Sequence, residues 1–257
     1  MPDEIARHGT AELRIALRPD LDEAEIERLA AKLDALRNGK KKQVILITSS
    51  VMGEGKSTVA SLLARSLAIH RKETLLIDFD LRRPKLHEIF EVDGKNGLID
   101  IMQSDLPFNS ALKTTSIPHL KLISSGNLDV TPSEILNNEL IKSFFDVIGN
   151  DFDNVVVDSP PVIHVSDPLL LSKFVNEVIL VVKAGSTPKY VIKRSISMFN
   201  DVKVKISGII LNNMQNTLPH YYDYKSYGYQ YYGYRGELEE SKIEKWKHDI
   251  RKWIPKK

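Results

Sequence analysis

The chain has 257 residues, of which 42% are hydrophobic and 27% are charged, as in ordinary soluble globular proteins. Its formal net charge of +2 gives no argument for a nucleic-acid partner, and its lack of cysteine excludes disulfide bonds and thiol catalysis. The longest apolar runs, such as residues 178–182, are too short to span a membrane, and the N-terminus lacks the pattern of a signal peptide.

Residues 1–42 form an N-terminal extension that the sequence predicts to be helical. Between Leu21 and Arg37 the apolar residues recur at helical spacing and give one apolar stripe: Ile26, Leu29, Leu33 and Leu36. Asn38-Gly39 is typical of a helix end. The helix either packs on the main domain or docks a partner or second subunit.

From residue 43 to about residue 215, apolar strands alternate with helical patterns. The predicted strands are 44–48, 74–78, 120–123, 155–158, 177–182 and 206–211, and the predicted helices are 55–71, 97–103, 134–149, 166–174 and 187–200. Strand runs that are apolar throughout suit strands covered on both faces. The order predicts an α/β fold with a doubly wound, mostly parallel sheet, helices on both faces and ligands at the carboxyl ends of the strands.

The loop after the first of these strands, residues 50–58, has the composition of a P-loop. Its backbone N–H groups and the start of the next helix are expected to bind a polyphosphate, assisted by the charge of Lys56, while the hydroxyl of Ser57 binds Mg²⁺. The usual first glycine of the motif is replaced by Ser50. The expected nucleotide-binding residues of the loop are Gly53, Glu54, Gly55, Lys56, Ser57 and Thr58.

Carboxylates follow two further strands. Asp78 and Asp80 come at the end of strand 74–78, and Asp158 comes at the end of strand 155–158. In a P-loop protein such carboxylates can hold Mg²⁺ or its water shell, and a close pair can divide its work between the metal and a proton. Each aspartate could instead cap the next helix. Three of them downstream of a P-loop favour the metal site.

Eight of the nine tyrosines lie in residues 221–234, within a segment, 216–235, that is expected to be flexible and exposed. They are Tyr221, Tyr222, Tyr224, Tyr227, Tyr229, Tyr231, Tyr232 and Tyr234. Such tyrosines can stack on bases, form a recognition surface or accept phosphoryl groups. The economical hypothesis is that they are substrates of the nucleotide site.

Residues 236–257 form an amphipathic C-terminal tail. Apolar residues that include Trp246 and Trp253 share one helical face, with lysine and arginine around them. A basic amphipathic helix can lie on a membrane surface, which would give peripheral membrane contact. The alternative, slightly favoured because four acidic residues dilute the positive charge, is a helix docked on its own domain or a neighbour.

Together these residues resemble the bacterial tyrosine kinases (BY-kinases), which regulate capsule and exopolysaccharide synthesis and export. The family's three nucleotide motifs correspond to residues 50–58, 75–82 and 155–161, and residues 131–136 and 207–212 resemble two further family stretches. The resemblance implies an ATP-dependent protein-tyrosine autokinase that phosphorylates its own C-terminal tyrosine cluster.

The resemblance also implies roles for individual residues. Lys56 would bind the β- and γ-phosphates, and Ser57, Asp80 and Asp158 would surround Mg²⁺. Asp78 would be the base toward the tyrosine hydroxyl. These assignments make Lys56 and the three aspartates the expected catalytic residues.

Asn212 would reach the adenine ring. The implied partners are a transmembrane activator of the polysaccharide co-polymerase type, a protein-tyrosine phosphatase and further copies of the chain, at the cytoplasmic face of the cell membrane. The family's ring-forming Glu-x-x-Arg-x-x-Arg motif is only half matched, by Glu4-x-x-Arg7 and by Glu25-x-x-Arg28.

Two other functions share most of these motifs. A partition- or septum-type switch ATPase would hydrolyse ATP without modifying protein, and a nucleotide-regulated scaffold would bind without turnover. Those ATPases carry a signature lysine five positions before the P-loop lysine, where this chain has Val51. They also have no evident use for a tyrosine cluster, so the kinase is favoured.

Overall fold

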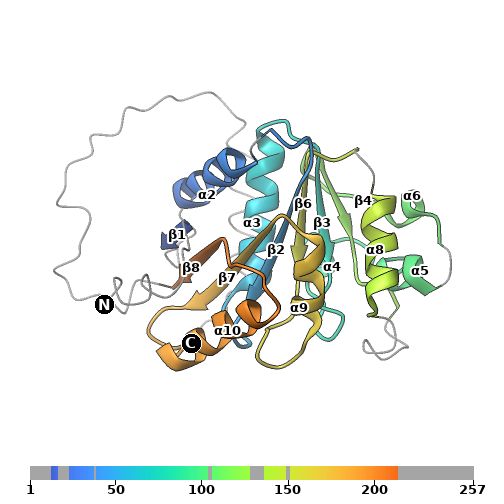
Figure 1. Ribbon diagram of the computed structural model, residues 1–257. Coiled ribbons are helices and arrows are strands. Elements are labelled where there is room, and N and C mark those ends of the chain that lie inside the picture. Colours follow the sequence, from blue (N-terminus) through green and yellow to red (C-terminus); the bar gives the residue numbers. More distant parts are fainter. Residues whose placement is uncertain are drawn as a thin grey trace, which may run out of the picture. The chain divides into compact units, whose positions relative to one another are not determined.

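Figure 1 shows the computed structural model of the chain, which describes residues 13–16, 23–37, 39–103, 106–127, 136–148 and 151–213. All of them belong to the first of the two units into which the chain divides, Met1–Thr217. The tyrosine tract, the C-terminal tail, the Glu4-x-x-Arg7 pattern and residues 131–135 lie outside the described residues. The expectations for those parts stay predictions.

The centre of the fold is a sheet of eight strands in the order β1-β8-β7-β2-β6-β3-β5-β4. The strands are β1 (Leu13–Ala16), β2 (Gln43–Ser49), β3 (Thr74–Asp78), β4 (Lys113–Thr114), β5 (Leu120–Ile123), β6 (Asn154–Asp158), β7 (Glu177–Lys183) and β8 (Gly208–Asn212). All neighbours are parallel except β4 and β5. The predicted α/β fold with a mostly parallel sheet is confirmed.

The helices occupy the connections between strands. In the described ranges they are α2 (Glu23–Leu36), α3 (Lys56–Ile69), α4 (Leu86–Ile89), α5 (Leu98–Gln103), α6 (Phe108–Ala111), α8 (Asn138–Val147), α9 (Asp167–Leu171), the 3₁₀ turn η2 (Ser172–Phe174) and α10 (Lys189–Asp201). The short helices α4 and α6 were not predicted, since four residues are too few to show a helical period. No helix of the described part is long and apolar enough to cross a membrane.

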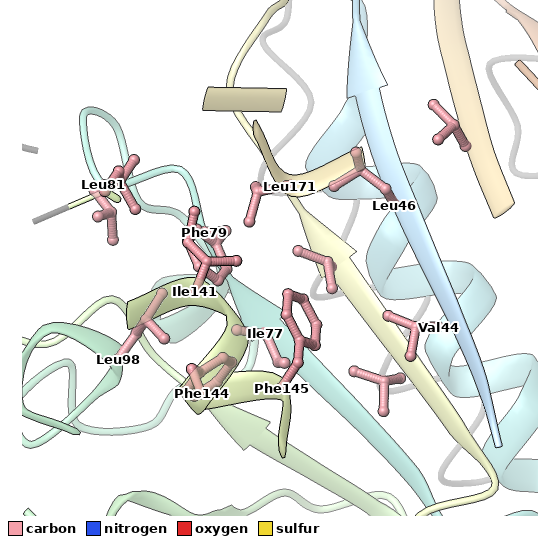
Figure 2. Close-up of a cluster of buried hydrophobic side chains, with 14 of the residues drawn as sticks. Val44, Leu46, Ile77, Phe79, Leu81, Leu98, Ile141, Phe144, Phe145 and Leu171 are labelled. Carbon is pink, nitrogen blue, oxygen red and sulfur yellow. The ribbon is translucent and has the colours of Figure 1, made fainter. Parts of the chain in front are cut away.

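The main hydrophobic core lies on the face of the sheet covered by α5, α8, α9 and α10. Val44 of β2 and Ile77 of β3 belong to it, together with Phe144 and Phe145 of α8 (Figure 2). The rings of Phe144 and Phe79 meet edge to face, with their centroids 6.0 Å apart. The alternate residues of these strands face the other way, where α3 packs on β2, β3 and β6.

The N-terminal extension contains the predicted helix and an unpredicted strand. Ile26, Leu29 and Leu33 of α2 are buried, and α2 packs against α3. The side-chain amide of Gln43 donates a 2.9 Å hydrogen bond to the carbonyl of Leu33, which fixes the end of α2 to the start of β2. Arg28 pairs with Glu25 of its own helix. Strand β1 pairs with β8, so this part of the extension completes the sheet.

Candidate active site

The site lies at the carboxyl end of β2, which has β6 on one side and β7 on the other. The chain leaves β2 toward β3 on one side and later returns to β7 on the other, so β2 is a switch point of the kind at which open parallel sheets bind ligands. Sheet register brings the acidic strand ends together here: Asp78 is paired with Asp158, and Asp158 with Ile47 of β2. The register therefore places these carboxylates at the same edge of the sheet as the P-loop, and their predicted role at a metal stays a prediction.

The P-loop backbone depends on two glycines. Gly53 has φ +79° and Gly55 has φ +91°, a region that residues with a Cβ atom rarely adopt. A Cβ on Gly55 would also lie only 2.3 Å from Nδ2 of Asn212. Ser50 does not have a positive φ, which explains why the loop tolerates serine at this position. Directly after Gly55, α3 begins, and its first N–H groups point toward the loop as an anion site requires.

Lys56 is the centre of the charged cluster. Its Nζ atom lies 2.7 Å from Oδ2 of Asp80 and 3.8 Å from Oδ1 of Asp158, and it donates a 3.1 Å hydrogen bond to the hydroxyl of Ser57. Burial opposes the charge of Lys56, but the carboxylates of Asp158 and Asp80 outweigh it and raise the pKa of Lys56. The lysine is therefore charged at neutral pH. It contacts three other predicted site residues, Ser57, Asp80 and Asp158.

The burial of the Asp158 carboxylate opposes its ionisation. The side chain is fully buried, and the groups nearest its carboxylate are the ammonium of Lys56, 3.8 Å from Oδ1, and the hydroxyl of Ser57, neither of which makes a hydrogen bond of good geometry to it. Burial raises the pKa of Asp158 to about 6, although the charge of Lys56 and the hydroxyl of Ser57 counteract part of that rise. Buried charged groups normally have close hydrogen-bonded partners, so these two oxygens are suited to act as ligands of a cation.

Asp78 is also fully buried, at the end of β3. Its Oδ2 accepts 2.9 Å hydrogen bonds from the backbone N–H groups of Lys85 and Leu86, while Oδ1 accepts only a long one, 3.3 Å, from Asp80 N. Burial, followed by the nearby charge of Asp158, raises the pKa of Asp78 to about 8. Oδ2 thus fixes the turn into α4, whereas Oδ1 accepts only one long hydrogen bond.

These residues fit a Mg²⁺ ion of the P-loop type. Among the described residues no group of three or more acidic or histidine side chains forms a protein-only metal cage. Mg²⁺ at phosphate sites takes one or two protein ligands and completes its shell with phosphates and water, so it needs no such cage. The hydroxyl of Ser57 and the carboxylate oxygens of Asp158 supply what that arrangement requires.

Glu54 and Asn212, both predicted to bind nucleotide, have other contacts in the structure. The Glu54 side chain is buried and turned into the protein. The side-chain amide of Asn212 donates a 2.9 Å hydrogen bond to the carbonyl of Glu54. The predicted contact of Asn212 with adenine stays a prediction, but the residue does lie against the P-loop backbone. Thr58, at the third position of α3, is partly exposed.

Sequence reasoning missed one acidic residue near the site. Asp167, the first residue of α9, is 5% exposed, and its Oδ2 lies 3.6 Å from Nε of Arg82. Burial raises the pKa of Asp167, whereas Arg82 lowers it. Because Arg82 follows Asp80 by two residues, this pair holds the acidic loop against α9. In the sequence, an aspartate directly before Pro168 is typical of a helix start, and nothing in the local pattern predicts its contact with Arg82.

Comparison with known families and relatives supports a nucleotide-binding fold. The family model described as ParA, "NUBPL iron-transfer P-loop NTPase", matches residues 40–246. The chain is 31% identical over 192 residues to the tyrosine-protein kinase CpsD of Streptococcus agalactiae, covering 74% of this chain and 84% of that protein. It is 30% identical over 199 residues to the tyrosine-protein kinase ptk of Acinetobacter johnsonii, covering 76% of this chain but 27% of that protein.

Solved structures give the same fold. The BceF tyrosine kinase domain aligns with a TM-score of 0.74 and 25% identity, covering 83% of this chain and 98% of that one. The septum site-determining protein MinD of Pyrococcus horikoshii, solved with Mg-ADP, aligns with a TM-score of 0.58 and 22% identity, covering 66% of this chain and 70% of that one. The second likeness shows the fold alone.

Proposed function

Because the chain belongs to the ParA-type P-loop NTPases and, within them, to the bacterial tyrosine-protein kinases, we propose that it transfers the γ-phosphoryl group of ATP to protein tyrosines, first of all to its own residues 221–234. The observation that carries this proposal is the cluster in which Lys56 lies between Asp80 and Asp158 at the end of β2. The role of such a kinase in capsule or exopolysaccharide synthesis and export is part of the proposal, and it follows from the resemblance to the BY-kinases.

The described residues can do the work of phosphoryl transfer mainly by positioning and by charge. Lys56 and the first N–H groups of α3 bind the β- and γ-phosphates. Ser57, Asp80 and Asp158 would hold Mg²⁺, whose charge would offset that of the phosphates. The Lys56 contact with Asp80 would loosen as the lysine turns toward phosphate, which frees a carboxylate for the metal.

The proposed reaction conserves every atom. The tyrosine oxygen gives its proton to Asp78 and forms a bond to the γ-phosphorus, while the bond from that phosphorus to the bridging oxygen breaks and ADP leaves. The less engaged Oδ1 of Asp78 is the proposed acceptor of the proton. A base whose pKa is about 8 matches a proton transfer near neutral pH.

The proposed setting is the cytoplasmic face of the cell membrane. There the kinase would meet a transmembrane activator of the polysaccharide co-polymerase type, a phosphatase that reverses the modification, and further copies of itself. Each phosphate adds a charge of about −1.5 to −2, so a phosphorylated tract should be repelled by the next ATP, and contacts between subunits through their tails should loosen. The C-terminal tail would supply any peripheral membrane contact.

The decisive experiment incubates the purified protein with γ-labelled ATP and Mg²⁺. Label on tyrosine supports the kinase, free labelled phosphate alone supports a switch ATPase, and neither product supports a scaffold. The switch ATPase is the second candidate because the ParA model and the MinD structure match this chain. Val51 stands where those ATPases carry their signature lysine, which weighs against it. The iron transfer named in the family description is not proposed for this chain, since the chain has no cysteine to hold an iron–sulfur cluster.

Transfer between subunits has its own test. A Lys56→Met chain with its tyrosines intact is mixed with an active chain whose eight tract tyrosines are phenylalanine. Label on the Lys56→Met chain is the expected result. Its absence, beside labelling of the wild type at a rate independent of protein concentration, would mean that each chain modifies itself. Sedimentation before and after phosphatase treatment then tests whether phosphorylation reduces the size of the assembly.

A further inference from the structure

Glu54 stands out among the P-loop residues because its charged side chain is buried within the fold. Only 2% of the residue is exposed, although the neighbouring Met52 and Gly53 face solvent. A carboxylate can be buried without a large penalty only when hydrogen bonds replace its water. The partners of Glu54 therefore identify what the side chain holds in place.

Three donors meet this carboxylate, one from the P-loop and two from the end of β7 and the loop after it. Its Oε2 accepts a 2.8 Å hydrogen bond from Val51 N, which closes the P-loop on itself. Its Oε1 accepts a 3.2 Å hydrogen bond from Lys183 N and a further one from the hydroxyl of Thr187. Lys183 is the last residue of β7, and Thr187 lies in the loop that leads from β7 to α10, so the carboxylate joins the P-loop to the end of β7 and the loop after it.

The backbone of the same P-loop residue is held from a third direction. The carbonyl of Glu54 accepts the hydrogen bond from Asn212, the last residue of β8. The carbonyl of Asn212 in turn accepts a 2.8 Å hydrogen bond from Ala184 N, in the loop after β7. The ends of β7 and β8 and the P-loop thus form one closed set of hydrogen bonds around Glu54.

We propose that Glu54 is a positioning residue for nucleotide binding, which acts by locking the P-loop to Thr187 in the loop after β7. The proposal rests on the proposed function only in that the site binds nucleotide. The N–H groups of the P-loop bind phosphate only while they converge, and Glu54 precedes Gly55 and Lys56 directly. Holding both its side chain and its carbonyl fixes the direction of the N–H groups that follow. On this account the 183–187 loop is part of the nucleotide site although it need not touch the ligand.

Thr187 offers the cleaner test because it is only partly buried, so its variants should fold. Thr187→Val removes the hydroxyl donor at nearly constant shape, and Thr187→Ser keeps it. The matched control is Thr114→Val. Thr114 is exposed on β4, and its hydroxyl accepts a hydrogen bond from Lys121 of β5. Binding of Mg·ADP is measured by titration calorimetry, which requires no transfer to tyrosine.

Thr187→Val should weaken Mg·ADP binding roughly two- to tenfold, the range that one lost hydrogen bond can produce. Thr187→Ser and Thr114→Val should bind as the wild type does. The Glu54→Gln chain should bind Mg·ADP more weakly still. Both carboxylate oxygens of Glu54 accept hydrogen bonds, so the NH₂ group of glutamine would face a donor where an acceptor is needed. Adding Thr187→Val to Glu54→Gln should cost little more, since the two residues act through one contact.

Two results would overturn the proposal. One is a Thr187→Val chain that binds Mg·ADP as tightly as the wild type while unfolding at a lower temperature, because the contact would then serve the fold alone. The other is full additivity of the Glu54 and Thr187 substitutions. If the wild type itself failed to bind Mg·ADP, the nucleotide site would be refuted first, whereas loss of tyrosine labelling with Mg·ADP binding intact would refute the kinase and leave this proposal standing.

Discussion

Replacing Asp158 with asparagine should remove much of the loss of stability that the ligand-free protein undergoes as the pH rises from 4 to 7, although it also removes a proposed metal ligand and a partner of Lys56. Burial raises the pKa of this carboxyl from 3.8 to about 6. Between about pH 4 and pH 6 the folded protein therefore holds more protons than the unfolded chain. The free energy of unfolding must fall as the pH rises through this range, because the charged carboxylate is tolerated better in the unfolded chain.

The size of the effect follows from the two pKa values. A rise of about two pKa units corresponds to about 3 kcal/mol, and most of this, about 2 kcal/mol, is lost between pH 4 and pH 7. Asparagine carries no charge and avoids the loss. Burial and then the charge of Asp158 raise the pKa of Asp78. The substitution should therefore also lower the pKa of Asp78, which enlarges the difference between variant and wild type.

The assay is urea unfolding followed by far-ultraviolet circular dichroism at pH 4 and pH 7. Tryptophan fluorescence is unsuitable because Trp246 and Trp253 lie outside the described domain. The stability of Asp158→Asn relative to the wild type should increase by about 2 kcal/mol or more from pH 4 to pH 7. Asp146→Asn, which removes an exposed carboxylate on α8, is the control. A relative stability that is the same at both pH values would refute the reasoning.

Three further predictions concern the loop, the base and the core. Gly55→Ala should weaken Mg·ADP binding at least about tenfold while circular dichroism shows a folded chain, because its φ is +91° and a Cβ would meet Asn212; unchanged affinity would contradict this. Asp78→Asn should keep Mg·ATP binding yet lose about 100-fold or more in tyrosine labelling. The wild-type rate should rise with pH up to about 8, as the base loses its proton; loss of nucleotide binding would instead assign Asp78 to the metal. Phe144→Ala should destabilise the fold by about 3–5 kcal/mol in urea, since the residue is 2% exposed, and a loss below about 1 kcal/mol would show that the core closes around the gap.

The sheet and the charged cluster were predictable for a shared reason. Parallel strands covered on both faces must be apolar throughout, so β2, β6 and β7 show in the sequence as continuous apolar runs. The carboxyl ends of such strands meet at one edge of the sheet, which places Asp78 and Asp158 side by side. The motif in residues 50–58 located the P-loop and its lysine, and the strand pattern with the sheet topology placed the acidic residues beside them.

What the sequence could not show were contacts between distant residues and elements that depend on their neighbours. Glu54 reads as one residue of a nucleotide loop, yet its partner Thr187 is 133 positions away. Asp167 reads as a helix start. Strand β1, with the sequence LRIA, is too short and too mixed to show a period, and it exists by pairing with β8. Such features arise from tertiary structure, which no local pattern records.

Strand β1 also protects the protein from association through its sheet. The open edge of a sheet offers unpaired N–H and C=O groups to any other strand, and proteins limit this hazard with very short edge strands. Here both outermost strands are short, β1 with four residues and β4 with two. A chain shortened to begin at residue 43, the boundary that the sequence pattern favours, would lose β1 and expose the side of β8 that pairs with Leu13–Ala16. Such a chain should aggregate edge to edge at lower concentrations than the 257-residue chain.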